Sequence, residues 1–174
     1  IKGERQNSKF ALLFIDLDDF KNINDTHGHS VGDEVLQIVA VMLKGVIRQE
    51  DTLARIGGDE FILVISGFKD EKVLLPLVNN LVQEFRKEYL VKGYSLRLSA
   101  SIGISLFPDD SQNINELMKY ADIAMYQSKS DGRDNFNFFT QTLNTKIHDE
   151  VNIINDMQRA LYDNEFQLYY QPKI

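Results

Sequence analysis

Residues 55–61 read RIGGDEF, two glycines and two adjacent acids in the middle of strand-forming sequence. The segment before the glycines, TLARI (52–56), and the segment after them, EFILVIS (60–66), are separated only by GGD. Gly-Gly supplies the positive φ values that tight two-residue hairpin turns demand. The sequence therefore predicts a β-hairpin that carries Asp59 and Glu60 at its turn.

Asp16 follows another extended segment, the apolar run FALLFI at 10–15. A continuous apolar run of this length suits a strand that is covered on both faces. If the hairpin pairs beside this strand, Asp16 meets Asp59 and Glu60 at one edge of a sheet. Hard cations such as Mg²⁺ prefer oxygen ligands, and glycines let a triphosphate approach the backbone N–H groups. The alternative, a plain turn with solvated acids, leaves Asp16 unexplained.

Two helices are predicted directly after Asp16. FKNINDTH (20–27) suits a short polar helix that stops at Gly28, a residue fitted to the left-handed conformation of a helix end. Ser30 is the expected N-cap of a longer helix with apolar residues at helical spacing. These apolar residues are Val31, Val35, Ile38, Val39, Met42 and Val46.

The second half of the chain predicts a further alternation of helices and strands. The expected elements are a helix over 69–90 interrupted near Pro76, a strand over 95–107, a helix over 113–133 ending near Gly132, and a strand over 135–139. Residues 140–164 are polar and favour a helical linker, and residues 165–174 look like the first strand of another domain.

Composition narrows the class of protein. A length of 174 residues allows one ordinary domain with an appended fragment, and the absence of cysteine excludes disulfides and thiolate-bound zinc. The net charge of −7 argues against broad binding to nucleic acid, but a mononucleotide can be held by a metal and local cations. No apolar run approaches a membrane span and no signal peptide begins the chain. We therefore expect this chain to lie in the cytoplasm and to make no membrane contact of its own. The full-length protein can be either free or anchored to a membrane.

Three motifs together carry a resemblance to a known family. RIGGDEF, FIDLDDFKNINDTHGHSVGDEVL (14–36) and ADIAMYQSKSDGR (121–133) resemble the GGDEF family of diguanylate cyclases, in the family's order and spacing from about Phe10 to Phe139. The resemblance implies an α/β (α+β), palm-like nucleotidyl cyclase domain with a mostly antiparallel central sheet flanked by helices. It also implies an enzyme that joins two GTP molecules into cyclic di-GMP. The family's upstream D-x-L-T-G-L-x-N-R segment is absent, so residues 1–139 are expected to be the domain without its N-terminal segment.

The resemblance assigns a metal site at the hairpin. Asp16, the backbone carbonyl of Leu17 and Asp59 are expected to bind Mg²⁺, with Mn²⁺ as a possible substitute, and Glu60 is required nearby. A ribose 3′-hydroxyl attacks the α-phosphorus of a second GTP and pyrophosphate leaves, which clustered carboxylates with metal support. Asp59 is the candidate general base, although a carboxylate that touches the metal can be only a ligand.

Cations and glycines are expected to hold the phosphates. Lys21 would stabilise the pentacovalent phosphate, and Lys129 and Arg133 match the residues that clasp the terminal phosphates. Gly57 and Gly58 would let the triphosphate approach the backbone. The alternative for Lys129 and Arg133 is that cations near a helix C-terminus complement its dipole.

Two further pairs of residues match family sites. Asn24 and Asp33 match the guanine-binding pair, because an amide and a carboxylate suit the edge of that base; the alternative for Asp33 is a capping box with Ser30. Arg48 and Asp51 match an inhibitory R-x-x-D site for product, where Arg can stack on guanine or grip phosphate. Their alternative is an Arg at a helix end and an Asp that starts a strand.

The product has two identical halves, so catalysis requires at least a transient homodimer. LYDNEFQLYYQPKI (161–174) resembles the opening of an EAL domain, the cyclic di-GMP phosphodiesterase domain. A rival function is therefore a non-catalytic GTP-binding module that regulates an adjacent EAL domain. The intact acids of the motif favour the enzyme. Asp134 stands where the family usually has Asn, a change expected to be tolerated.

Overall fold

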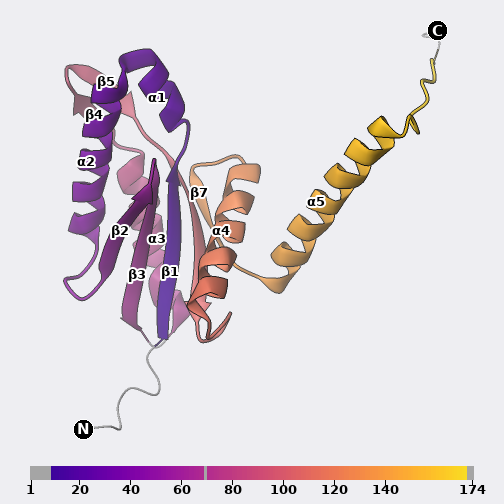
Figure 1. Cartoon of the computed structure of the whole chain (residues 1–174). Coiled ribbons are helices and arrows are strands. Elements are labelled where there is room, and N and C mark those ends of the chain that lie inside the picture. Colours follow the sequence, from indigo (N-terminus) through magenta and orange to yellow (C-terminus); the bar gives the residue numbers. More distant parts are fainter. Residues whose placement is uncertain (1–8, 69, 172–174) are drawn as a thin grey trace. The chain divides into compact units, whose positions relative to one another are not determined.

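A twisted sheet of five strands forms the centre of the molecule (Figure 1). The computed structural model describes residues 9–68 and 70–171, without the side chains of residues 148, 150 and 151. The strands of this sheet are β1 (Lys9–Leu17), β2 (Thr52–Gly57), β3 (Glu60–Phe68), β6 (Ala100–Phe107) and β7 (Asn135–Phe138). Their spatial order is β2-β3-β1-β6-β7, antiparallel throughout except for the parallel pair β6–β7. The predicted α/β fold with a mostly antiparallel sheet is confirmed.

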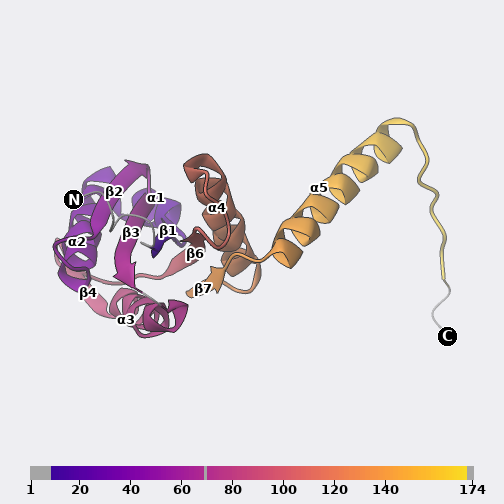
Figure 2. The ribbon, with the colours of Figure 1, turned by 90° about the horizontal axis from the view of Figure 1, so that it is seen from below.

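Helices cover both faces of the sheet, as Figure 2 shows from below. They are α1 (Phe20–His27), α2 (His29–Val46), α3 (Leu74–Phe85) and α4 (Ile114–Ser130). Because side chains alternate along a strand, Leu13 and Ile15 of β1 pack with α2 and α3, while Leu12 and Phe14 pack with α4. This double coverage explains why the apolar run of β1 is continuous.

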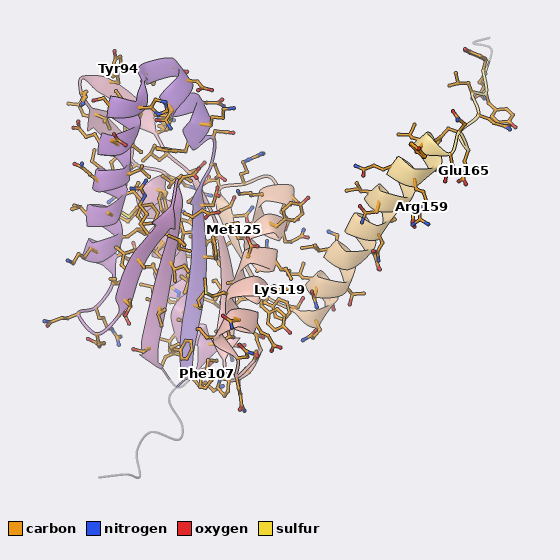
Figure 3. The ribbon with its side chains drawn as sticks, viewed as in Figure 1. Tyr94, Phe107, Lys119, Met125, Arg159 and Glu165 are labelled. Atoms are coloured by element: carbon orange, nitrogen blue, oxygen red, sulfur yellow. The ribbon has the colours of Figure 1, made fainter. Side chains whose placement is uncertain are left out.

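Helix α4 lies unusually close to the sheet at Gly103 of β6. A Cβ atom added to Gly103 would lie 1.9 Å from the carbonyl oxygen of Ala121 and 2.2 Å from the backbone nitrogen of Met125. Figure 3 labels Met125 on the side of α4 that faces the sheet. The missing side chain therefore sets the distance between α4 and the sheet.

The segment between β3 and β6 differs from the prediction. The predicted helix over 69–90 is a short 3-10 turn (Glu71–Val73) followed by α3, and Pro76 lies in the first turn of α3, where proline is tolerated. A second, two-stranded sheet follows, made of β4 (Glu88–Val91) and β5 (Tyr94–Arg97). The single strand predicted over 95–107 is thus two strands, β5 and β6, in different sheets.

Two local predictions about glycine and serine were also wrong in part. Gly28, with a φ of 86°, is the N-cap of α2 as well as the C-cap of α1, and the hydroxyl of Ser30 instead accepts a hydrogen bond from Lys92. Ser30 therefore forms no capping box with Asp33. In the hairpin only Gly58 has a positive φ, of 51°, because Gly57 still pairs with Glu60 as the last residue of β2.

The chain divides into two units, Ile1–Thr140 and Gln141–Ile174. The second unit contains α5 (Gln141–Tyr162), which agrees with the helix-prone character of that stretch. Residues 165–171 form no strand, and the rest of the predicted last strand, 172–174, lies outside the described residues. Among the described helices, none has the length and apolar character needed to cross a bilayer.

Candidate active site

The hairpin turn and the end of β1 bring the predicted acids together. Asp16 and Glu60 are direct partners in the antiparallel pairing of β1 with β3. The backbone nitrogen of Leu17 donates to the carbonyl oxygen of Asp59 at 3.4 Å. In the turn itself, Arg55 Nε donates to the carbonyl of Gly58 at 2.9 Å. The sequence predicted this meeting of acids at one edge of the sheet.

Lys129 reaches the same acids from α4, the helix that covers the face of the sheet opposite to α2 and α3. Its Nζ lies 2.8 Å from Oδ1 of Asp16, whose side chain is only 12% exposed. Burial raises the pKa of Asp16; the hydrogen bond and charge of Lys129 lower it, and the charges of Asp59 and Asp18 raise it again. One cation therefore offsets part of a larger negative charge.

Glu60 experiences the same accumulation of charge. Burial raises its pKa, and repulsion from Asp16 and Asp59 raises it further. Carboxylates placed this close repel one another, and a bound cation relieves that repulsion. The site therefore attracts positive charge.

The donor set fits Mg²⁺ by its chemistry. Among residues 9–68 and 70–171, no three His, Cys, Asp or Glu side chains converge closely enough to hold a metal ion by themselves. Mg²⁺ commonly uses only one or two carboxylates, with phosphate oxygens completing its shell. Asp16 and Asp59, together with the carbonyl of Leu17, would make up that smaller set of hard oxygen donors.

The remaining predicted cations follow two other elements, β1 and α4. Lys21 is exposed in the first turn of α1, directly after β1. Arg133 follows the end of α4 and has a left-handed backbone with a φ of 64°. Its backbone nitrogen donates to the carbonyl of Ser128 at 3.0 Å, which ties it to the last turn of α4.

The predicted guanine pair lies at the corner where α1 meets α2. Asn24 is on α1 and Asp33 is exposed on the first turns of α2. A Cβ atom added to Gly32 would lie 2.0 Å from Oδ1 of Asn24, so the amide packs directly against the backbone of α2. Asn24 and Asp33 are therefore held on adjacent helices at one corner.

The corner is braced by the hairpin of β4 and β5. Tyr94, labelled in Figure 3, stacks obliquely on His27 with ring centroids 4.6 Å apart. Lys92 contacts Ser30 and lies 3.9 Å from the carboxylate of Glu34. His27 is thus both the last residue of α1 and part of this brace.

Arg48 and Asp51 are not brought to the acids. Both precede β2, and at roughly 3.3 Å per residue the strand puts Asp51 about 20 Å from Gly57 at the hairpin turn. The carboxylate of Asp51 accepts from the backbone nitrogens of Arg48, at 2.9 Å, and Ser66, at 3.2 Å. The Arg48 side chain is 67% exposed and lies 3.9 Å from Glu50. Asp51 thus has a structural role, and Arg48 is accessible.

Sequence reasoning missed two acids near the site. Asp18 is 8% exposed and accepts hydrogen bonds from Ser101 and from the backbone of Asp134. Asp122 on α4 contributes to the raised pKa of Glu60. Asp122 carries a sequence signal, because it precedes Lys129 by about two helical turns, whereas Asp18 follows the last residue of β1 and carries none.

Comparisons with known proteins identify the family of this chain. The family model described as "Diguanylate cyclase, GGDEF domain" matches residues 1–135. The chain is 40% identical over 170 residues to MucR of Pseudomonas aeruginosa, a bifunctional diguanylate cyclase/cyclic di-GMP phosphodiesterase, covering 98% of this chain and 25% of MucR. It is 38% identical over 162 residues to NbdA of the same species, a cyclic di-GMP phosphodiesterase, covering 93% and 21%. The chain thus spans about a quarter of the length of these curated relatives.

Solved structures show the same fold. The GGDEF domain of YfiN (TpbB) from Pseudomonas aeruginosa matches with a TM-score of 0.75 and 33% identity over 78% of this chain and 84% of that one. The active GGEEF domain of a diguanylate cyclase from Vibrio cholerae matches with a TM-score of 0.68 and 28% identity over 76% and 83%. With the family model and its relatives in agreement, the chain belongs to the GGDEF family.

Proposed function

We propose that this chain is a diguanylate cyclase that condenses two GTP molecules into cyclic di-GMP and pyrophosphate. The observation that carries the proposal is the pairing of Asp16 with Glu60 beside Asp59, with Lys129 placed against Asp16. A set of carboxylates with one bound cation is suited to the magnesium-dependent chemistry that the GGDEF family generally uses.

Asp16, Asp59 and the carbonyl of Leu17 would hold Mg²⁺ or Mn²⁺, with Glu60 beside them. When bound, the metal supplies positive charge that acidifies the attacking hydroxyl and neutralises the phosphates. In this proposal Asp59 takes the proton of the 3′-hydroxyl as general base. The oxygen–phosphorus bond to the α-phosphate then forms while the bond to pyrophosphate breaks.

The cations orient and stabilise the phosphates. Lys129 and Arg133, on and just after the last turn of α4, clasp the terminal phosphates, and Lys21 balances charge at the α-phosphorus. Lys129 already holds a carboxylate 2.8 Å away, so its ammonium group is kept at the site before substrate binds. Gly57 and Gly58 present no Cβ atoms, and nothing lies within 4 Å of where those atoms would be.

Asn24 and Asp33 recognise guanine from the corner of α1 and α2. Asp33 forms no capping box with Ser30, and its side chain is exposed, which supports the binding role over the capping alternative. A carboxylate accepts from the ring N–H and exocyclic amine of guanine.

Two chains are needed because each site holds one GTP and the product is twofold symmetric. We therefore propose a transient homodimer with the two hairpins facing each other. Product inhibition is proposed at Arg48, whose exposed guanidinium can stack on guanine or bind phosphate. Asp51 accepts hydrogen bonds from two backbone nitrogens. In this proposal it stabilises the loop before β2 and also contacts the ligand.

A second function has its own support. NbdA, 38% identical to this chain, is described as a phosphodiesterase, and the chain covers 21% of it. In such a protein this domain would bind GTP and regulate a neighbouring EAL domain without catalysis. The corresponding division is a domain over 1–139, a helical linker over 140–164 and the start of an EAL domain over 165–174.

The deciding experiment measures cyclic di-GMP formed from GTP and Mg²⁺ at several protein concentrations. The cyclase predicts product that rises more steeply than protein concentration and disappears in Asp59→Asn. As a matched control, Asp156→Asn removes a carboxylate from α5 and should leave the rate unchanged. Magnesium-dependent GTP binding without product at any concentration would favour the regulatory module, and absence of GTP binding would rule out both functions.

A further inference from the structure

Asp18 is a buried carboxylate that the proposed reaction does not use. It follows the last residue of β1 and is 8% exposed. Its Oδ1 accepts from the hydroxyl of Ser101 at 2.7 Å, and its Oδ2 accepts from the backbone nitrogen of Asp134 at 3.0 Å. A buried carboxylate is tolerated only when such bonds satisfy it. Asp18 thus joins the sheet to the loop after α4.

That loop has an uncommon backbone. Arg133 and Asp134 both have positive φ values, 64° and 52°, although neither is glycine. Arg adopts this region less readily than Asp does, so surrounding contacts have most to hold at Arg133. The conformation of Arg133 therefore depends on what binds its neighbours.

Asp134 is held from a second side. Arg86, at the C-terminal end of α3, donates from Nε to Oδ2 of Asp134 at 2.8 Å and from a terminal nitrogen to its carbonyl at 3.0 Å. Asp18 binds the N–H of the same residue. Asp134, which stands where the family usually has Asn, thus has a charged partner on α3 that an amide would engage less strongly.

We propose that Asp18 is a positioning residue for substrate: by holding Asp134, it fixes the left-handed turn that directs Arg133 toward the terminal phosphates of GTP, with Arg86 as its counterpart from α3. The inference rests on the proposed role of Arg133 in binding GTP. It gives Asp16, in β1, and Asp18, just after β1, separate tasks: Asp16 contacts Lys129, and Asp18 sets the backbone next to Arg133.

A purely structural role makes a different prediction. If Asp18 only joined the sheet to the loop, its loss would lower stability and weaken every ligand alike. If it acts through Arg133, its loss weakens ligands with terminal phosphates and spares those without them. GTP and GMP separate the two roles, since both carry guanine and only GTP carries the β- and γ-phosphates.

The test compares magnesium-dependent binding of GTP and GMP by calorimetry in the 174-residue chain. Asp18→Ala should weaken GTP about tenfold, the loss of one charge-assisted contact, and change GMP less than twofold. Asp18→Asn should restore binding, because its amide can still accept from Asp134 and donate to Ser101. Ser101→Ala, which leaves the bond to Asp134 in place, is the matched control and should bind GTP normally.

Two further variants keep the test decisive. Arg86→Gln, at a half-exposed side chain, should also weaken the binding of GTP and spare that of GMP. In an Arg133→Ala background, Asp18→Ala should add less than twofold. Equal losses for GTP and GMP, or full additivity with Arg133→Ala, would overturn the inference. Because binding is the readout, a chain that binds GTP and makes no product counts against the proposed reaction alone.

Discussion

At the end of β1 two carboxylates, Asp16 and Asp18, are each 8% exposed, whereas along α5 the apolar side chains of Ile154, Met157 and Leu161 are 53%, 52% and 65% exposed. Each region reverses the usual distribution of residues. Buried carboxylates need partners, and the first region provides them in Lys129, Ser101 and the backbone of Asp134. Exposed apolar residues at helical spacing are typical of surfaces that bind another protein surface.

The two regions therefore differ in the contacts that stabilise them. The first is specified by contacts inside residues 9–140, so substitutions there should change stability or substrate binding strongly. The second presents its apolar side chains outward, so the same kinds of substitution should have little effect on unfolding. Four measurements test this contrast.

Gly103→Ala should have the largest effect on stability. The added methyl group would meet backbone atoms of Ala121 and Met125 at about 2 Å, and backbone cannot move aside without shifting α4. We expect a loss of about 3 kcal/mol in the free energy of unfolding, measured with urea. Gly45→Ala on α2 is the matched control: nothing lies within 4 Å, and alanine should stabilise that helix by about 0.5–1 kcal/mol. Equal effects at both positions would contradict the close packing.

Gly32→Ala should act on binding more than on folding. Its methyl group would displace the amide of Asn24, a movable side chain, from its position against α2. The KM for GTP should rise about tenfold with a smaller change in kcat, the pattern of lost binding energy. The same substitution at Gly45, which lies on the same helix as Gly32, should leave the KM for GTP unchanged. A fall in kcat with KM constant would place Asn24 in another role.

Glu60→Gln should stabilise the domain in a pH-dependent way. Burial and repulsion raise the pKa of Glu60 in the folded state above its ordinary value of 4.5, so the folded protein holds that proton more tightly than the unfolded chain. Stability therefore falls as pH rises through the folded pKa. At pH 7 the variant should melt about 2 °C higher, and the difference should vanish below pH 4. Asp163→Asn in the second unit should leave the melting temperature unchanged at both pH values.

Leu161→Gln should have the smallest effect. Its side chain is 65% exposed on α5, and surface substitutions of this kind usually change the free energy of unfolding by less than about 0.5 kcal/mol. Urea unfolding followed by circular dichroism measures this change. A loss comparable to that of Gly103→Ala would show that α5 is held by packing and would remove the contrast between the two regions.

Patterns of local sequence were sufficient to predict most of the sheet and its site edge. The apolar run before Asp16 and the GGD between two extended segments predicted β1, β2 and β3, and the meeting of Asp16 with the hairpin followed from their pairing. The β4–β5 hairpin was missed because residues 88–90 were assigned to the end of a helix and residues 95–97 to a longer strand, although Lys92 and Gly93 turn the chain between them with positive φ values. Ser30 was misassigned because its hydroxyl is used by Lys92, a residue far away in sequence.

The roles of Asp18 and Asp134 depend on contacts that no local pattern reveals. Asp18 meets Ser101 and Asp134 only after β1, β6 and α4 have packed together. The left-handed backbone of Arg133 and Asp134 is equally invisible in the sequence, since neither residue is a glycine. Long-range hydrogen bonds of this kind require the structure.

The central place of β1 in the sheet has a consequence for how the protein is made. β1 is synthesised before both of its neighbours in the sheet, and Phe14 pairs with Ile62 on one side and Gly103 on the other. Such distant pairings form slowly, and the apolar run of β1 stays uncovered until they do. Asp16 cannot meet Lys129 until α4 has been synthesised. A nascent chain that stops before α4 therefore has the GGDEF hairpin but lacks the contact between Asp16 and Lys129.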